Sequence, residues 1–121
     1  MTRHKVLLAE DDDLLASLLN FRLKKAGHEV HLSTNGREVK ERLKVATPDI
    51  IVTDIMMPYF SGLELTDYVR KELKLEIPII VLSSAGNEEN IVSAFKLGAN
   101  DFLTKPISPS ELLIRLSKAL H

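Results

Sequence analysis

Four acidic residues stand directly behind the first apolar segment of the chain. In the stretch LLAEDDDLL, residues 10–13 are one Glu and three Asp before leucines resume. Asp12 and Asp13 can be explained as a helix start, because Asp is a good N-cap and acids in a first turn complement the helix dipole. Glu10 and Asp11 are not needed for that purpose, and they repel each other at close range unless a cation neutralises them. The row therefore indicates either a long helix start or a divalent-cation site.

Three later apolar segments end in residues that suit phosphoryl transfer. DIIVTD ends in Asp54, PIIVLSS contains Ser83, and DFLTKP contains Lys105. A carboxylate such as Asp54 can attack phosphorus and form an acyl phosphate if its own negative charge is offset. Mg²⁺ held by Asp11 and Asp54, with Glu10 orienting a metal-bound water, would offset that charge. Lys105 and the Ser83 hydroxyl would then hold the phosphoryl oxygens that the metal leaves free.

A regular alternation of two patterns must position these residues. Short apolar segments favour strands, and the longer stretches between them repeat their apolar residues with helical period. The expected strands are 5–9, 29–33, 49–54, 78–84 and 101–106, and the expected helices are about 13–26, 35–48, 62–73, 87–97 and from 108 onward. In the first helix, the expected core stripe consists of Leu15, Leu18, Leu19 and Arg22.

The ends of the helices carry capping residues. Gly27 follows the first helix as a good C′ residue. The last helix opens with SPSE, where Pro109 suits the first helical position. Ser108 and Glu111 have the spacing of a capping box.

The strands read as parallel strands buried on both faces. The first, third and fourth are nearly continuous apolar runs, as expected when helices cover both sides of a sheet. Regular alternation of strand and helix predicts an α/β fold with a doubly wound parallel sheet and right-handed crossovers. Ligands of such sheets bind beyond the carboxyl ends of the strands. Because Glu10, Asp11, Asp54, Ser83 and Lys105 all follow strand ends, we expect them to converge there.

Composition excludes several classes of protein. The chain has 121 residues, 45% of them apolar, which suits one domain over residues 1–121. Lys and Arg total 16 against 17 for Asp and Glu, so no direct nucleic-acid role is expected. There is no cysteine and no membrane-length apolar run, and MTRHK leads straight into a short strand rather than into a signal peptide. We therefore expect a soluble, cytoplasmic protein without a membrane partner.

Four separated stretches contain the candidate site residues, namely VLLAEDDD, IIVTDIMMPYFSGLEL, PIIVLSS and GANDFLTKPI. In this order and spacing they resemble the motifs of response-regulator receiver domains of two-component signalling, and the resemblance spans residues 3–120. It implies a single flavodoxin-like (βα)5 domain with strand order 2-1-3-4-5. It implies Asp54 as phosphoacceptor, Glu10 and Asp11 as acidic pair, the Met56 carbonyl as metal ligand, Ser83 as switch hydroxyl, Phe102 as switch aromatic, Lys105 as phosphate-binding lysine, Pro58 and Gly62 in the loop, and Pro106 after a cis bond.

The resemblance also implies cofactor, partners and output. The cofactor is Mg²⁺ or Mn²⁺, the partner is a sensor histidine kinase or a phosphotransfer protein, and the domain is a phosphorylated switch rather than an enzyme. A phosphorylation-promoted homodimer would use the face of the fourth helix, fifth strand and fifth helix. Val92 and Phe95 either form its apolar patch or face the sheet instead. The expected interface residues are Val92, Phe95, Asp101, Leu113 and Arg115.

Three other classes of protein share part of the pattern. A metal-dependent phosphatase normally places a second acid two residues after its Asp nucleophile, where this chain has Met56. A flavodoxin-like nucleotide binder needs a phosphate loop rich in Gly, Ser or Thr where this chain has four acids. A module that only binds proteins would not need the acids, hydroxyl and lysine. The histidines, which are scattered, lack zinc spacing and are expected at the surface or sheet edge, are His4, His28, His31 and His121.

Overall fold

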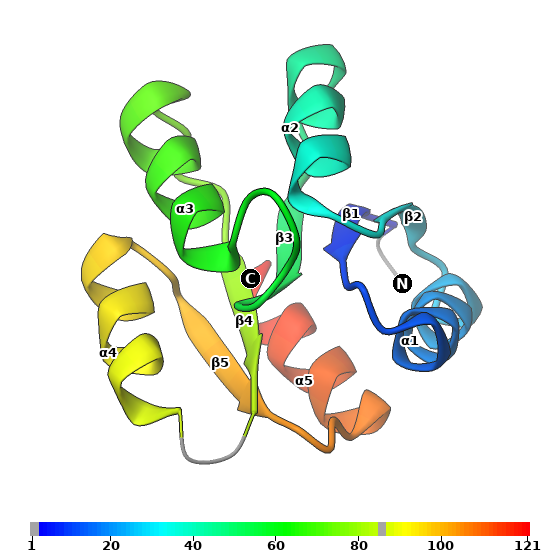
Figure 1. Ribbon diagram of the computed structural model, residues 1–121. Coiled ribbons are helices and arrows are strands. Elements are labelled where there is room, and N and C mark those ends of the chain that lie inside the picture. The colour runs from blue at the N-terminus through cyan, green and yellow to red at the C-terminus, as the bar shows by residue number, and fades with distance from the viewer. Residues whose placement is uncertain (1–2, 85–86) are drawn as a thin grey trace.

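A parallel sheet of five strands forms the centre of the molecule within residues 3–84 and 87–121, which the computed structural model describes (Figure 1). Its order is β2-β1-β3-β4-β5, and Val6 of β1 lies opposite both Val30 and Ile50. The predicted doubly wound α/β fold and its strand order are therefore confirmed. The strands are β1 (Lys5–Ala9), β2 (Glu29–Ser33), β3 (Ile50–Asp54), β4 (Ile79–Ser83) and β5 (Asp101–Thr104).

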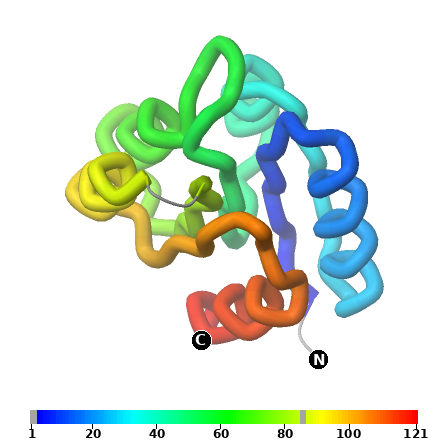
Figure 2. The backbone as a smooth tube through the Cα atoms, turned by 60° about the horizontal axis from the view of Figure 1, so that its bottom comes forward, coloured from blue at the N-terminus to red at the C-terminus, as the bar shows by residue number. Residues whose placement is uncertain are grey.

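The helices cover both faces of this sheet (Figures 1 and 2). The third predicted helix is interrupted, because its second half is a π-helical turn in which the Leu73 amide bonds to the Tyr68 carbonyl at 3.0 Å. No helix among the described residues is long and apolar enough to cross a membrane. The helices are α1 (Asp13–Lys25), α2 (Gly36–Val45), α3 (Gly62–Asp67), the π-helical turn η1 (Tyr68–Glu72), α4 (Glu88–Leu97) and α5 (Pro109–Ala119).

Two hydrophobic cores lie on opposite faces of the sheet. One joins the strands to α1 and α5, through side chains such as Leu19 and Leu112. The other joins the strands to α2, α3, η1 and α4, through side chains such as Val39, Leu65 and Ala94. Because β1, β3 and β4 are buried on both faces, their carboxyl ends are held rigidly between the two cores.

The predicted core stripe of α1 is confirmed for Leu15 and Leu19 and wrong for Leu18 and Arg22. Leu19 and Leu23 are fully buried and Leu15 packs partly against the core, whereas Leu18 is 45% exposed. Arg22 does not face the core either, because its Nη2 donates to the Ser110 hydroxyl at 3.1 Å. Positions 16, 19 and 23 follow the helical repeat of 3.6 residues and face the sheet. The outer face of α1 is itself apolar, with Leu18 on it, so apolarity alone did not identify the buried side.

The helix caps agree in part with the predicted ones. The Asp12 side chain caps α1 by accepting from the Leu14 and Leu15 amides, so Asp12 is the N-cap. At α5, Ser108 accepts from the Glu111 amide, which is only half of the predicted capping box. The complete box among the described residues lies at the start of α3, where Ser61 and Glu64 bond reciprocally.

Candidate functional site

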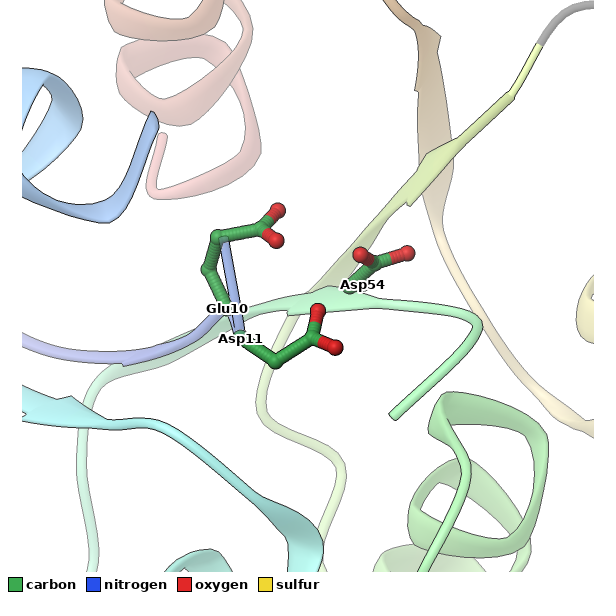
Figure 3. Close-up of side chains that lie close together, drawn as sticks. All are labelled: Glu10, Asp11 and Asp54. Atoms are coloured by element: carbon green, nitrogen blue, oxygen red, sulfur yellow. The ribbon is translucent and has the colours of Figure 1, made fainter. Parts of the chain in front are cut away.

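Three carboxylates meet at the carboxyl ends of β1 and β3. Glu10, Asp11 and Asp54 each place one oxygen within 4.8 Å of the others. Figure 3 shows Glu10 and Asp11 on the segment after β1, with Asp54 at the end of β3 beside them. Glu10 and Asp54 are buried, whereas Asp11 is exposed and faces the solvent. The structure thus brings together the acids that the sequence placed at separate strand ends.

The register of the sheet explains why these acids meet. β1 and β3 are adjacent and parallel, with Ala9 opposite Thr53, so both strands end at the same level. The next residue of each strand is then an acid, Glu10 in one and Asp54 in the other. Parallel neighbours ending together therefore create the site without any long loop.

Lys105 enters the site from the segment after β5. Its Nζ lies 2.8 Å from Asp54 Oδ2 and 3.4 Å from Glu10 Oε1. The Lys105 amide donates to the carbonyl of Ser83 at 2.7 Å, which ties the ends of β4 and β5 together. The bond between Lys105 and Pro106 is cis, as predicted. The two contacts of Nζ show that the lysine side chain is directed inward, toward the acids.

Ser83 lies at the end of β4, in the same region. It is 1% exposed, and its hydroxyl donates to the Ser84 carbonyl at 3.2 Å. That bond is long and local, so the hydroxyl has no strong partner among the residues that the structure describes. Within that part of the chain, it can rotate toward a new acceptor without breaking a tertiary contact.

Burial and charge shift the pKa values of this cluster. Desolvation, with the nearby Asp54 charge, raises the pKa of Glu10 to about 7, although the Asp12 amide and Lys105 act in the opposite direction. Burial alone would lower the pKa of Lys105, but the hydrogen bond and charge of Asp54, together with Glu10, raise it above its usual value. The Lys105 ammonium therefore stays charged, while the Glu10 carboxyl is partly protonated near pH 7.

The donor set fits a hard divalent cation. Glu10 Oε1 is buried and has no hydrogen-bond partner among the described residues, since the Lys105 ammonium at 3.4 Å forms an ion pair but lacks hydrogen-bond geometry. A buried carboxylate oxygen left in that condition is costly. Mg²⁺ and Mn²⁺ prefer oxygen ligands such as carboxylates, and this cluster offers three of them. Glu10, Asp11 and Asp54 can thus hold a metal ion.

The loop after Asp54 lies at the edge of this cluster. The Met56 amide donates to Asp54 Oδ1 at 3.2 Å, while the Met56 side chain is 63% exposed. Gly62 closes the loop, because its amide donates to the Ile55 carbonyl at 2.8 Å. A Cβ atom at Gly62 would lie 2.3 Å from the Asp54 carbonyl oxygen, so only glycine fits there. Pro58 stands between Met56 and Gly62, farther from the carboxylates along the chain.

The structure gives the orientation of the side chains on the face of α4, β5 and α5, which the sequence left open. Val92 and Phe95 are 52% and 42% exposed, so these α4 residues face outward and not toward the sheet. Phe95 packs edge-to-face on Phe102, with ring centroids 5.8 Å apart. Phe102 is partly buried against the core that contains α4. The two rings connect β5 with the exposed surface of α4.

Two of the expected interface residues already have partners within the chain. Arg115 pairs with Asp101 at 2.6 Å, and their part in a two-fold interface stays a prediction. Leu113 packs partly against the core of α1 and α5, whereas its neighbour Ile114 is 67% exposed. Helical spacing alone did not separate these adjacent positions, because both are apolar.

Three of the four histidines are not scattered. The rings of His4 and His28 have centroids 5.8 Å apart, and those of His4 and His121 are 6.2 Å apart. They come from the start of β1, the turn before β2 and the residues after α5. In this fold those segments lie together at the end of the sheet opposite the carboxylates. The sequence alone did not show this, because the three histidines are far apart along the chain. Burial and His4 lower the pKa of His28.

A sequence model of the family described as the response regulator receiver domain matches residues 6–117. The chain belongs to the response regulator receiver domain family. Its curated relatives include the alkaline phosphatase synthesis transcriptional regulatory protein PhoP of Bacillus subtilis, which is 34% identical over 117 residues. Those residues are 97% of this chain and 48% of PhoP, so this receiver domain spans about half the length of that relative.

Solved structures of receiver domains have the same fold. The receiver domain of the Francisella response regulator 1452 is 34% identical, with a TM-score of 0.90, over 97% of this chain and 96% of that one. The chemotaxis response regulator CheY4 of Vibrio cholerae is 30% identical, with a TM-score of 0.89, over 98% and 99% of the two chains. The resemblance expected from the motifs is therefore confirmed for family and fold.

Proposed function

We propose that this receiver domain is a switch in which Asp54 accepts a phosphoryl group in a Mg²⁺-dependent reaction. The observation that carries the proposal is the convergence of Asp54 with Glu10, Asp11 and the Lys105 ammonium at one end of the sheet. Response regulator receiver domains are the signalling switches of two-component systems, which agrees with such a role. A nucleophile, a cation site and a phosphate-binding cation are what phosphoryl transfer to a carboxylate needs.

Glu10, Asp11, Asp54 and the Met56 carbonyl are the residues that would hold the metal. When bound, Mg²⁺ or Mn²⁺ offsets the negative charge of both the carboxylate and the incoming phosphoryl group. A cation held there would favour the ionised form of Glu10, whose pKa is raised to about 7. It would also satisfy the buried Oε1 of Glu10, which has no hydrogen-bond partner among the described residues.

The proposed transfer moves one phosphoryl group from a phosphohistidine to Asp54. An Asp54 carboxylate oxygen attacks phosphorus, and the P–N bond to the imidazole breaks as the new O–P bond forms. The imidazole leaves with the bonding electron pair. Lys105 exchanges its bond to Asp54 Oδ2 for one to a phosphoryl oxygen.

The phosphoryl group then draws Ser83 toward it and changes the surface. The bond of the Ser83 hydroxyl within the described part of the chain is a long local one to the Ser84 carbonyl, which is easily given up. As Ser83 moves, the Phe102 ring turns inward, which takes the partner of Phe95 away from the surface of α4. This is a population shift, because the phosphoryl group bonds Ser83 better in the active state.

The partners follow from this chemistry. The phosphodonor is a sensor histidine kinase or a phosphotransfer protein, and the location is the cytoplasm. The active state presents the face of α4, β5 and α5, on which Val92 and Phe95 are exposed, to a second copy of the domain. No direct contact with nucleic acid is proposed for this domain, whose charges nearly cancel.

The decisive experiment is intact-mass measurement after incubation with a small phosphodonor and Mg²⁺. The wild type should gain the mass of one phosphoryl group, and Asp54→Asn should gain none. Excess chelator should abolish the gain in the wild type. Phosphorylation of Asp54→Asn to the same extent as the wild type, or full phosphorylation of the wild type in excess chelator, would contradict the proposal.

A metal-dependent phosphatase remains the nearest rival chemistry. The position two residues after Asp54 is Met56, whose amide donates to Asp54 and whose side chain is not an acid. The site therefore lacks the general acid that such a phosphatase places there. We expect no sustained turnover of a generic phosphate ester, and steady turnover that depends on Asp54 would favour the phosphatase instead.

A further inference from the structure

The loop between Asp54 and α3 rests on the first turn of α2 (Figure 2). The Gly36 amide donates to the Pro58 carbonyl at 3.2 Å. A Cβ atom at Gly36 would lie 2.1 Å from Phe60 Cβ and 2.2 Å from the Phe60 carbonyl oxygen. Only a residue without a side chain lets the two backbones approach so closely. The tip of the loop is therefore seated directly on α2.

An aromatic pair and a cation extend this contact toward η1. The Phe60 ring packs edge-to-face on Tyr68, with centroids 5.8 Å apart and an interplanar angle of 80°. The ammonium of Lys40, one turn further along α2, lies 5.4 Å from the Phe60 ring and 4.9 Å from the Tyr68 ring. Cations are attracted to the faces of aromatic rings at such distances. Lys40 thus joins α2, the loop and η1.

The stem of the loop is fixed as well. The Gly62 amide donates to the Ile55 carbonyl, and Gly62 packs against the backbone of Asp54. Met56 lies between this stem and the tip at Pro58. With both ends held, the backbone at Met56 has little freedom relative to the Asp54 carboxylate.

We infer that Gly36, Lys40 and Phe60 are positioning residues that hold the Met56 backbone, whose amide donates to Asp54 Oδ1 at 3.2 Å, in place beside the metal site. The inference rests on the proposed Mg²⁺ site. None of the three touches the carboxylates, so their effect passes through the loop. If these residues are purely structural, substituting them lowers stability but does not weaken Mg²⁺ binding by the folded protein. If they position the loop, substituting them weakens Mg²⁺ binding itself.

The test compares two phenylalanines of matched chemistry. Phe60 and Phe95 are both partly exposed and both pack edge-to-face with centroids 5.8 Å apart, but Phe95 lies on α4, away from the loop. Isothermal titration of each folded variant with Mg²⁺ should show affinity about tenfold lower in Phe60→Ala, as for other losses of support around metal ligands. Phe95→Ala should bind Mg²⁺ like the wild type.

Lys40 and Lys44 provide a second matched pair on α2. Lys44 is exposed and pairs only with Glu41, at 3.3 Å. Lys40→Met should weaken Mg²⁺ binding, and Lys44→Met should not. In metal-free protein, amide exchange at Gly36 should become faster in Phe60→Ala but not in Phe95→Ala, because the Gly36 amide bonds to the loop.

The outcomes separate this inference from the proposed function. Wild-type protein that fails to bind Mg²⁺ would overturn the metal site itself, and the positioning role with it. Wild-type binding combined with equal affinities in Phe60→Ala and Phe95→Ala would overturn the positioning role alone. Faster exchange at Gly36 with unchanged Mg²⁺ affinity would show that the contact is structural, and would also overturn it.

Discussion

The ammonium of Lys105 forms ion pairs with two buried carboxylates at once, with Nζ 2.8 Å from Asp54 Oδ2 and 3.4 Å from Glu10 Oε1. A bound metal ion would take carboxylate oxygens that Lys105 now contacts, and a phosphoryl group on Asp54 would offer Lys105 new acceptors. We therefore expect Lys105 to change partners when the site is filled. Because its amide bonds to the Ser83 carbonyl, we expect this change to reach the ends of β4 and β5.

Lys105→Ala should bind Mg²⁺ but fail to switch. Removing a nearby positive charge does not weaken a cation site, whereas the bond between Lys105 and the phosphoryl oxygens is lost. With a phosphoryl mimic such as beryllofluoride bound, the NMR shifts of Ser83 and Phe102 should stay near their unphosphorylated values. Shifts identical to those of the wild type would refute this role.

The same variant should be less stable without metal. Leaving two buried acids without their cation costs roughly 3 kcal/mol near neutral pH. Lys71→Ala is the control, because Lys71 pairs with Asp67 at the exposed surface, and such pairs contribute at most about 1 kcal/mol. Urea denaturation of both variants measures the difference. Equal losses of stability would contradict the buried pairing.

The raised pKa of Glu10 predicts how stability depends on pH in metal-free protein. Because the folded state favours the protonated acid, this contribution is complete below the ordinary pKa of 4.5 and is lost as pH rises through about 7. A shift of that size corresponds to roughly 3 kcal/mol. Glu10→Gln keeps the neutral form at every pH and should therefore gain stability over the wild type between pH 5 and pH 8.

Urea titrations at several pH values check this expectation. Glu89→Gln, at an exposed position in the first turn of α4, should follow the wild-type curve. Mg²⁺ should bind more tightly to the wild type at pH 8 than at pH 6, because bound cation and proton compete for Glu10. A constant difference between Glu10→Gln and wild type over this range would exclude a shifted pKa.

The sheet and the carboxylate cluster were predictable for a common physical reason. Apolar runs such as those of β3 and β4 can be buried on both faces only in a parallel sheet under helices. Once the strands are parallel and end together, Glu10 and Asp54 must lie near each other. Local sequence therefore indicated the parallel α/β sheet and the end of it that carries the site, whereas the strand order that places β1 beside β3 came from the resemblance to receiver domains.

Other features depend on contacts that local sequence does not encode. The outer face of α1 is as apolar as parts of its inner face, so the buried side could not be read from periodicity. The pairing of Asp101 with Arg115 depends on where β5 and α5 lie relative to each other. The gathering of His4, His28 and His121 depends on which segments share one edge of the sheet.

Ser83→Ala should accept the phosphoryl group and yet switch poorly. The hydroxyl makes a long bond to the Ser84 carbonyl at 3.2 Å, and the loss of this bond should cost about 1 kcal/mol of stability or less. Intact mass should show normal phosphorylation, while NMR should show a reduced active-state population. Ser84→Ala, at an exposed neighbouring position, is the control. An unaltered active population in Ser83→Ala would exclude the hydroxyl as the switch.

Arg70 should be a major contributor to stability outside the site. Its guanidinium donates to the carbonyls of Gly98 and Leu75 and to the Asn100 side chain, at 2.7 to 3.1 Å, which ties η1 to the end of α4. Arg70→Met should cost roughly 2–3 kcal/mol in urea denaturation, because several acceptors lose a charged donor. Arg70→Lys should recover only part of the lost stability, since one ammonium group cannot reach all the acceptors that the planar guanidinium contacts. Lys71→Met should be nearly neutral, and an equal effect of both Met variants would contradict this assignment.

The dimer proposal makes the sharpest prediction about the outer surface. Val92 and Phe95 are exposed on α4, and Arg115 pairs with Asp101 of its own chain at 2.6 Å. In a two-fold dimer on this face, the pair can be exchanged between copies, since each copy offers one partner of each sign. Sedimentation should therefore show a monomer without a phosphoryl mimic and a dimer with it.

Charge at this face should control that dimer. Phe95→Asp and Arg115→Glu should each prevent it, and adding Asp101→Lys to Arg115→Glu should restore it by reversing both signs. Phe21→Asp is the control, because Phe21 is 61% exposed on α1, on the other side of the sheet. A monomer under all conditions would contradict the dimer proposal. A dimer that tolerates Phe95→Asp but not Phe21→Asp would place the interface on α1, where the exposed apolar residues Leu14 and Leu18 lie beside Phe21 on the same helix.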